Sequence, residues 1–266
     1  MSRRLLLVTV LGAMAAVPPG VAAQEPLRLF AAGSLRAVMT EIGQAYATAG
    51  GVPVQGEFGP SGLLRDRLAK GEQADVFASA NMEHPASLHA AARSGPVTPF
   101  ARNRLCALVA PGLPVTTDTL LDRMLDPAVK LGMSTPKADP SGDYALELFA
   151  KAETQKAGAR AALEAKALKL TGGPDSPPPP KDRSVYGMLV AERKADIFLT
   201  YCTNAKAARD ENPALAIVAV PAPLAVGANY GLTVIVGAGP AATQFAQFVL
   251  SADGQRILAR HGFDAP

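Results

Sequence analysis

The chain has 266 residues, of which 48% are hydrophobic and 18% are charged, and its formal net charge is +3. Its 26 Lys and Arg residues are scattered and form no stripe with aromatic residues, so we expect no nucleic-acid partner. The length allows one large domain or two of moderate size, each with its own core.

The first 23 residues have the pattern of a secretory signal peptide. Arg3 and Arg4 precede an apolar stretch over residues 5–17, and Val21-Ala22-Ala23 before Gln24 suits cleavage. The apolar stretch is too short for a stable membrane anchor, and no cysteine lies near the cleavage site to carry a lipid. We therefore expect a soluble exported protein, with the signal peptide over residues 1–23 removed near Ala23.

Short apolar runs alternate with helical periodicity along the rest of the chain, which is typical of an α/β protein with mostly parallel strands. Apolar stripes predict helices that begin near Val38, Leu63, Tyr144 and Val185. The predicted strands cover residues 27–31, 52–58, 76–79, 105–109, 131–134, 197–201, 216–220 and 232–236.

Two segments late in the chain have clear local signals. Residues 171–181 include four consecutive prolines, which exclude a helix or a central strand and predict a stiff surface loop. The C-terminal part predicts a helix over residues 240–250, a cap at Ser251 or Asp253, and a short last helix that Gly262 ends.

The two cysteines, Cys106 and Cys202, would enter an oxidising compartment. A disulfide between them is the expected outcome, and two buried free thiols in strands are the alternative. The three histidines, His84, His89 and His261, have no ligand spacing with the cysteines, so we expect no metal site and no cofactor.

Three serines, each beside a glycine, follow predicted strands and precede predicted helices. They are Ser34 beside Gly33, Ser61 beside Gly62, and Ser141 beside Gly142. In an open α/β sheet this position is the carboxyl edge of the strands, where ligands bind. The first turn of each helix offers unpaired N–H groups and a positive dipole end, and serine adds a small hydroxyl donor. The pattern predicts an anion site.

Two other interpretations of these serines remain open. Serine is a preferred helix N-cap, so each could simply satisfy its own helix. A secreted serine hydrolase with Ser61 or Ser141 as nucleophile fits less well, because residues 59–63 lack the last glycine of a nucleophile elbow. No histidine is placed convincingly as a base, since the helix dipole explains His261.

Two more side chains are candidates for the same edge. Tyr201 closes the predicted strand over residues 197–201, so its hydroxyl could be a further donor, although a core or rim tyrosine fits the pattern equally well. Arg183 lies between the proline segment and the helix that begins near Val185, and it is either a site residue or a surface arginine.

Six segments, in order along the chain, resemble the periplasmic molybdate-binding proteins that serve ABC importers. They are "LFAAGSLRAVMTEIGQAY", "FGPSGLLRDRLAKGEQADVFASAN", "NRLCALVAPG", "DPSGDYALELF", "VAERKADIFLTY" and "FVLSADGQRILARHGF". The stretch over residues 74–80 is the most distinctive of them. The resemblance covers nearly all of the chain that follows the signal peptide.

The resemblance implies a two-lobe periplasmic binding protein fold of type II, with mixed sheets and a ligand cleft between the lobes. Lobe I would comprise residues 24–104 and 222–266, and lobe II residues 105–221. The oxyanion contacts of the family fall on Ser34, Ser61, Ser141 (through its backbone) and Tyr201. A fifth contact, a small apolar residue in well-known members, falls on Arg183, which is a departure that could change the ligand.

We therefore expect a monomeric, non-enzymatic binding protein in the periplasm that passes molybdate or tungstate to the membrane permease subunits of an ABC importer. Neutral donors can replace the water around such a dianion, because hydrogen bonds to a charged acceptor contribute about 1.5 to 3 kcal/mol each. If Arg183 faces the cleft, the alternative is an organic acid or a different oxyanion.

Overall fold

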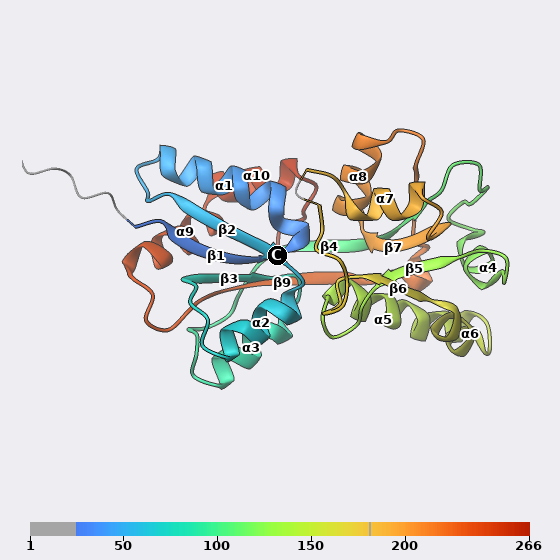
Figure 1. Cartoon of the computed structure of the whole chain (residues 1–266), viewed down its shortest axis with the longest axis horizontal. Helices are drawn as coiled ribbons and strands as arrows, with labels where there is room; N and C mark the ends of the chain where they lie inside the picture. The colour runs from blue at the N-terminus through green and yellow to red at the C-terminus, as the bar shows by residue number, and fades with distance from the viewer. Residues whose placement is uncertain (1–24, 181) are drawn as a thin grey trace, which may run out of the picture.

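The computed structural model describes residues 25–180 and 182–266, so the predicted signal peptide lies outside the described residues. It is an α/β structure with helices on both faces of a mixed sheet, which confirms the predicted fold class (Figure 1). The strands are β1 (Leu27–Ala32), β2 (Val54–Gly59), β3 (Val76–Ser79), β4 (Thr98–Val109), β5 (Leu131–Ser134), β6 (Leu168–Thr171), β7 (Ile197–Tyr201), β8 (Ala216–Ala219) and β9 (Gly227–Val234).

The helices fall into two groups along the sheet in Figure 1. The first group surrounds β1, β2 and β3, and consists of η1 (Gly33–Leu35), α1 (Arg36–Thr48), α2 (Ser61–Ala69), α3 (Glu83–Ala90), α9 (Pro240–Leu250) and α10 (Ala252–Arg260). The second surrounds β5, β6 and β7, and consists of α4 (Leu120–Leu125), α5 (Pro140–Gln155), α6 (Ala159–Lys166), α7 (Val185–Ala191), α8 (Cys202–Glu211) and η2 (Ala222–Leu224). Among the described residues, no helix has the length and apolar character to cross a membrane.

Strands β4 and β9 connect the two halves of the sheet. The strand order is β2-β1-β3-β9-β4-β7-β5-β6, with β8 also paired to β4. Residues Thr98 to Arg104 of β4 pair with β9, whereas Leu105 to Val109 pair with β7 and β8. This change of partner falls at the boundary predicted between residues 104 and 105. It supports the division into lobes, which stays a prediction.

The expectation of mostly parallel strands is wrong. Strand β1 runs parallel to β2 and β3, and β5 runs parallel to β6 and β7. Every pairing of β4 and β9 is antiparallel. Only η2, a short 3-10 turn, lies between β8 and β9, so no long helical crossover returns the chain to a parallel position there.

The predicted apolar stripes face the core. In α1, Val38, Ile42 and Tyr46 are buried, while the stripe ends before Ala49, which is exposed and caps the helix. At the C-terminus, α9 spans the predicted range. Ser251 caps α10 by accepting a hydrogen bond from the Gly254 amide, and Gly262 follows the helix with φ +86°. These predictions are confirmed, with Ser251 rather than Asp253 as the cap.

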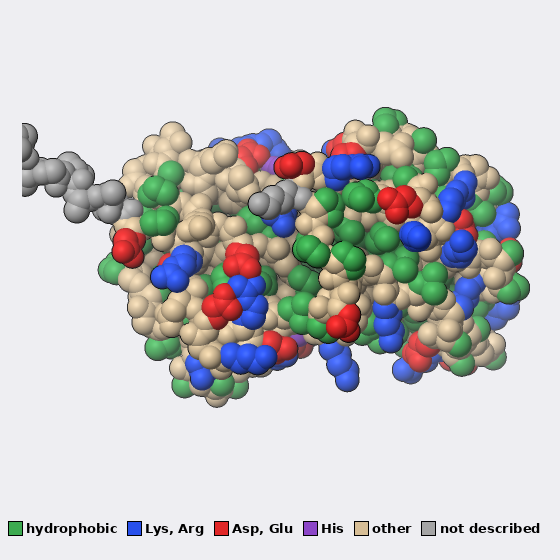
Figure 2. All heavy atoms as spheres, in the orientation of Figure 1, with side chains coloured by type: hydrophobic (Ala, Val, Ile, Leu, Met, Phe, Trp, Pro, Cys, Tyr) green, Lys and Arg blue, Asp and Glu red, His purple; other side chains and the backbone are tan. Residues whose placement is uncertain are grey.

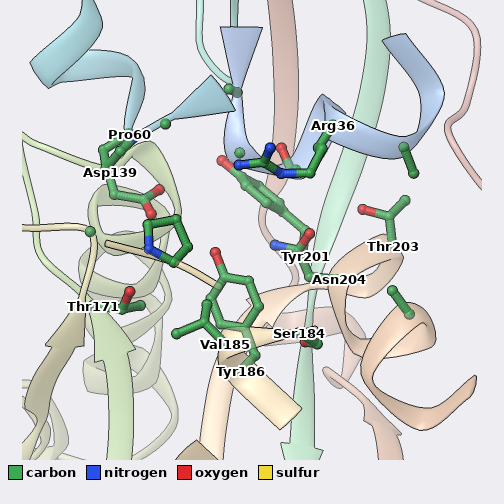
Figure 3. Close-up of a pocket in the computed structure, with 18 of the residues that line it drawn as sticks. Arg36, Pro60, Asp139, Thr171, Ser184, Val185, Tyr186, Tyr201, Thr203 and Asn204 are labelled. Carbon is green, nitrogen blue, oxygen red and sulfur yellow. The ribbon is translucent and has the colours of Figure 1, made fainter. Parts of the chain in front are cut away.

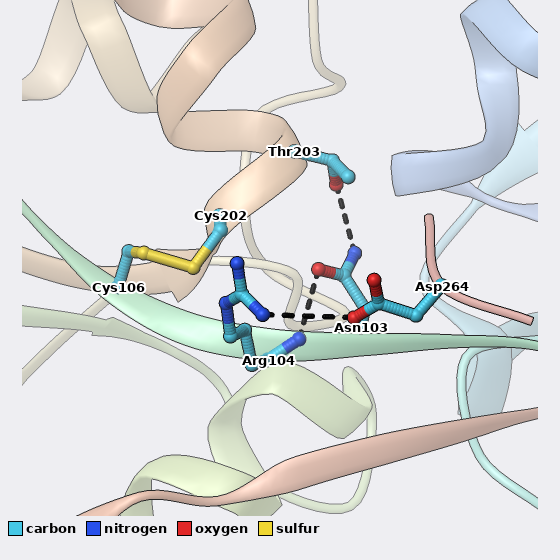
Figure 4. Close-up of a disulfide and its surroundings, with 6 residues drawn as sticks. All are labelled: Asn103, Arg104, Cys106, Cys202, Thr203 and Asp264. Carbon is cyan, nitrogen blue, oxygen red and sulfur yellow. Dashed lines mark hydrogen bonds and ion pairs between the residues drawn. A yellow bond between two sulfur atoms is a disulfide. The ribbon is translucent and has the colours of Figure 1, made fainter. Parts of the chain in front are cut away.

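Cys106 and Cys202 form a disulfide that ties the start of α8 to β4 (Figure 4). Their Cα atoms lie 4.9 Å apart, and the pair is separated by 96 positions in the sequence. Beside it, the Asn103 side-chain amide donates to the Thr203 Oγ1 at 2.8 Å. The first turn of α8 is therefore fixed to β4 at the point where β4 passes from one half of the sheet to the other.

We expect loss of this disulfide to destabilise the chain by about 2 to 4 kcal/mol, because it closes a long loop in the unfolded state. The measurement is urea unfolding with and without a reductant. The double variant Cys106→Ala, Cys202→Ala is the control, and reductant should leave its midpoint unchanged. Equal midpoints for the wild-type chain in both conditions would contradict the prediction.

Candidate anion-binding site

A cavity of about 900 Å³ lies where the two halves meet, and residues from both halves line it. The first half contributes residues at the carboxyl ends of its parallel strands: Ala32 of β1, Gly59 of β2 and Ala80 after β3. The second half contributes Thr171 of β6 and Tyr201 of β7, with the loop that follows β6. This is the sheet edge at which α/β proteins bind their ligands.

Ser34 and Ser61 both line this cavity, as predicted from the sequence. Ser34 lies in η1, and its hydroxyl shares a hydrogen bond of 2.9 Å with the Tyr230 hydroxyl. The Ser61 Oγ accepts a hydrogen bond of 3.1 Å from the Ala80 amide. Because that bond uses Ser61 Oγ as acceptor, the hydroxyl hydrogen remains available to donate to a ligand.

Tyr201 also lines the cavity and shares a hydrogen-bond partner, Ala80, with Ser61. Its hydroxyl donates to the Ala80 carbonyl at 3.4 Å, and its ring packs against Tyr144 and Tyr230. Burial raises the pKa of Tyr201 well above its ordinary value, so the phenol is neutral and keeps its hydrogen. Ser61 and Tyr201, which come from different halves, therefore meet at the backbone of Ala80.

Ser141 departs from the prediction, because it does not line the cavity. It is fully buried, and its hydroxyl donates to the Ser134 hydroxyl at 2.9 Å. Its backbone N–H, the group expected to hold the oxyanion, donates instead to Asp139 Oδ1 at 3.1 Å. Helix α5 begins at Pro140 with Asp139 as its N-cap, which turns Ser141 back toward β5.

The capping interpretation of the three serines is wrong as well. The residues that cap α1, α2 and α5 are Leu35, Pro60 and Asp139. Serine capping explains two other positions in the chain. Ser184 accepts from the Gly187 amide at the start of α7, and Ser251 does the same for α10.

Three arginines line the cavity, and one of them, Arg260, pairs with Glu41. Arg183 is exposed and lies on the segment between the proline loop and α7, so it is both a surface residue and a pocket residue. The sequence analysis missed Arg36, whose guanidinium lies 5.0 Å from the centre of the Phe58 ring and donates to the Phe58 carbonyl at 3.4 Å. Its position two residues after Ser34, in the first turn of α1, could have identified it.

The proline segment is more than a surface loop. Pro174 and residues 177–180 line the cavity, together with Gly172 and Gly173 just after β6. Figure 2 shows Lys, Arg, Asp and Glu side chains of both signs across this face of both halves. At the rim of the cavity, Lys206 pairs with Asp210, and Arg260 and His261 both pair with Glu41, which lowers the Glu41 pKa.

The sequence analysis also missed Asp139, whose carboxyl group accepts the hydrogen bond from the Ser141 amide. It lines the cavity, and burial raises its pKa from 3.8 to about 6, with a smaller contribution from Asp143. The Ser141 amide and the Ser134 hydroxyl oppose this rise. The sequence Asp-Pro-Ser-Gly is the signal that could have identified it, since Asp before Pro at a helix start is typical of an N-cap.

The described residues give no support to a metal centre or to a hydrolase site. No cluster of three His, Cys, Asp or Glu side chains that could hold a metal occurs within residues 25–180 and 182–266. The hydrogen bonds of Ser61 and Ser141 described above involve no histidine, and the His261 ring binds Glu41. The arrangement offers a ligand hydrogen-bond donors from both halves, with the guanidinium groups of Arg36 and Arg183 in the same cavity, which is the arrangement of a binding site.

The chain belongs to the family of bacterial extracellular solute-binding proteins, which it matches over residues 27–264. An uncharacterized protein of Pasteurella multocida, PM1146, is 40% identical over 77% of this chain and 86% of its own length. The molybdate-binding protein ModA of Mycobacterium tuberculosis is 29% identical over 90% of this chain and 84% of ModA.

Solved structures show the same two-lobe fold. The periplasmic molybdate-binding protein of Azotobacter vinelandii has a TM-score of 0.71 at 15% identity, over 90% of this chain and 99% of that protein. The sulfate-binding protein SubI of Mycobacterium tuberculosis has a TM-score of 0.72 at 19% identity, over 90% and 86%. PEB3 bound to L-phospholactate has a TM-score of 0.69 at 16% identity, over 90% and 100%.

The raised pKa of Asp139 leads to a stability prediction that needs no ligand. The folded chain holds this proton more tightly than the unfolded chain, so the associated stabilisation is present below about pH 4 and is lost as the pH rises through 6. Asp139→Asn removes this titration and keeps a capping oxygen. Relative to the wild type, its free energy of unfolding should increase by up to about 3 kcal/mol between pH 4 and pH 7.5.

Urea denaturation at the two pH values provides the measurement. Asp210→Asn, which changes an exposed carboxyl group at the same cavity, is the control and should show no such pH-dependent difference. A difference between Asp139→Asn and the wild type that is the same at both pH values would show that the folded chain does not raise the Asp139 pKa.

Proposed function

We propose that this chain is the periplasmic binding protein of an ABC importer and that it captures a tetrahedral oxyanion, molybdate or tungstate, in the cavity between its halves. The observation that carries the proposal is the convergence of neutral donors from both halves. Ser34 and Ser61 come from the first half and Tyr201 from the second, and all three line one cavity.

Hydrogen bonding explains how such a site holds a dianion. Each of the four oxygens of a tetrahedral oxyanion accepts hydrogen bonds, and each bond to a charged acceptor contributes about 1.5 to 3 kcal/mol. The Ser61 hydroxyl hydrogen is available, and the Tyr201 hydroxyl is held only by a long bond of 3.4 Å that a ligand oxygen can replace. Arg36 and Arg183 add positive charge to the same cavity.

The transport role follows from the fold. The donors lie on both sides of the cavity, so an anion bound to them draws the halves together and excludes water, as in hinge closure of other periplasmic binding proteins. The closed form would be the one that the membrane permease subunits recognise. In this proposal the chain is exported after cleavage near Ala23, acts as a monomer and makes or breaks no covalent bond.

The size of the cavity, together with Arg36 and Arg183, favours a second ligand class. About 900 Å³ is far more space than a four-oxygen anion fills, since a water molecule occupies about 30 Å³ in the liquid. The planar fork of arginine also suits carboxylates and phosphates. A small organic anion that carries such a group is therefore the alternative. The similar structures include a sulfate-binding protein and PEB3 bound to L-phospholactate, which agrees with a range of anions for this fold.

A titration separates the two ligand classes. Molybdate, tungstate, sulfate, phosphate and phospholactate are each added to the mature protein, and the thermal unfolding midpoint is followed. The bound anion, at a hundred times its dissociation constant, should stabilise the fold by about 2.7 kcal/mol. We expect the largest shift with molybdate or tungstate. A shift with phospholactate alone would favour the organic anion, and no shift with any of the five would contradict both.

Ser61→Ala tests the donors directly. Loss of one hydrogen bond to a charged acceptor should weaken the affinity for molybdate by about 10- to 150-fold, measured by calorimetry. Ser251→Ala is the matched control, because Ser251 caps α10 and does not line the cavity. It should leave the affinity unchanged. Equal affinities for Ser61→Ala and the wild type would remove Ser61 from the site.

A further inference from the structure

Asp139 holds a carboxyl group at the place where α5 would otherwise offer its first amide to an anion. The Asp139 Oδ1 accepts the hydrogen bond of 3.1 Å from the Ser141 N–H, and Asp139 lines the cavity. Figure 3 shows the Asp139 carboxyl group and the Tyr186 hydroxyl both directed into the pocket. A ligand in the middle of the cavity therefore faces a carboxyl group on this side.

The backbone around Asp139 leaves this carboxyl group little room to turn away. Its own N–H donates to the Thr135 carbonyl at 2.9 Å. The Asp139 side chain also packs closely against Gly172. Any side chain at that position would place its Cβ 2.7 Å from both the Cβ and the Oδ2 of Asp139. Gly172 also has φ +78°, so the glycine allows the loop after β6 to pack directly against the carboxyl group.

Among the described residues, the groups that act on Asp139 carry no positive charge. Asp143 of the same helix is the charged group that acts on it, and Ser134 faces it from β5. The phenols that interact with it, Tyr186 from α7, Tyr201 from β7 and Tyr230 from β9, are neutral because burial raises their pKa values.

The described cationic side chains of the cavity have other partners or are exposed. Lys206 pairs with Asp210, Arg260 with Glu41, and the Arg36 guanidinium lies over Phe58. Arg183 lines the exposed part of the cavity. Within the described parts of the chain, no Lys or Arg forms an ion pair with Asp139.

We propose that Asp139 makes anion binding proton-linked: a fully deprotonated anion enters the pocket together with one proton from solvent, which the Asp139 carboxyl group holds. This inference rests on the proposed function, because it needs an anionic ligand. An ionised carboxylate would repel the anion, whereas the protonated group donates its O–H to a ligand oxygen. One proton thus converts an unfavourable contact with the anion into a hydrogen bond.

The empty protein is already prepared for this change. Burial raises the Asp139 pKa to about 6, so the group is mostly ionised above pH 7 in the empty pocket. A bound anion raises that pKa further, since a nearby negative charge disfavours the ionised form. Above pH 6 the affinity should therefore fall about tenfold for each pH unit, until the pH reaches the pKa of Asp139 in the complex.

Calorimetry counts the protons directly. Molybdate and, in parallel, phospholactate are titrated into the mature wild-type protein at pH 7.5 in buffers with different ionisation enthalpies. The slope of the observed heat against the ionisation enthalpy gives the number of protons taken up. We expect close to one proton for the wild type and close to none for Asp139→Asn, which should bind with an affinity that does not change between pH 6.5 and 8.5.

Asp210→Asn is the matched control, because its carboxyl group lines the same cavity but is exposed. It should keep the proton uptake of the wild type. Binding without proton uptake in the wild type overturns the inference and leaves the proposed function standing, and uptake that persists in Asp139→Asn removes Asp139 as the proton acceptor. Absence of heat and of any thermal shift with both anions overturns the proposed function, and the inference with it.

Discussion

The two halves of the molecule meet in hydrogen bonds to one residue, Ala80, directly after β3. Ser61 accepts from its amide, and Tyr201 of the other half donates to its carbonyl. Tyr201 in turn packs on Tyr230, whose hydroxyl binds Ser34. The donors of the pocket are thus members of one network, so their relative positions depend on how β4 and β9 carry the sheet from one half to the other.

The pocket combines neutral hydrogen-bond donors with charged groups of both signs. Tyr201, Ser34 and Ser61 offer hydrogens without net charge, and Arg36 and Arg183 approach from the first and second halves. Asp139 supplies the opposite charge when it is ionised, and its carboxyl group accepts the hydrogen bond from the Ser141 amide at the start of α5. A pocket of this kind discriminates by protonation as well as by charge and size, because the same carboxyl group repels when ionised and donates when neutral.

Much of this could be predicted from the sequence. The sequence predicted one shared edge for Ser34 and Ser61, which lie beside glycines after strands, and for Tyr201, which closes a strand. All three line one cavity. Ser141 lies outside the cavity, because Asp139 and Pro140 set the start of α5 and the Asp139 carboxyl group accepts the hydrogen bond from the Ser141 amide.

The apolar periodicity did not predict the antiparallel pairings, because it indicates which positions are buried and not the direction of a strand. Residues 98–104 and 168–171 form strands with polar or half-exposed positions, so they show no apolar run. Arg36 was missed, although its position two residues after Ser34, in the first turn of α1, indicates the same edge.

We propose that an oxyanion binds between the two halves on the Ser61 and Tyr201 hydroxyls. Anomalous X-ray scattering from crystals of the mature protein grown with molybdate or tungstate locates the heavy atom without reference to any assumed contact. We expect one strong peak in the cavity, with ligand oxygens at hydrogen-bond distance from Ser61 and Tyr201 and with the Asp139 carboxyl group facing the ligand. A peak elsewhere on the molecule, or an empty cavity at saturating anion, would contradict it.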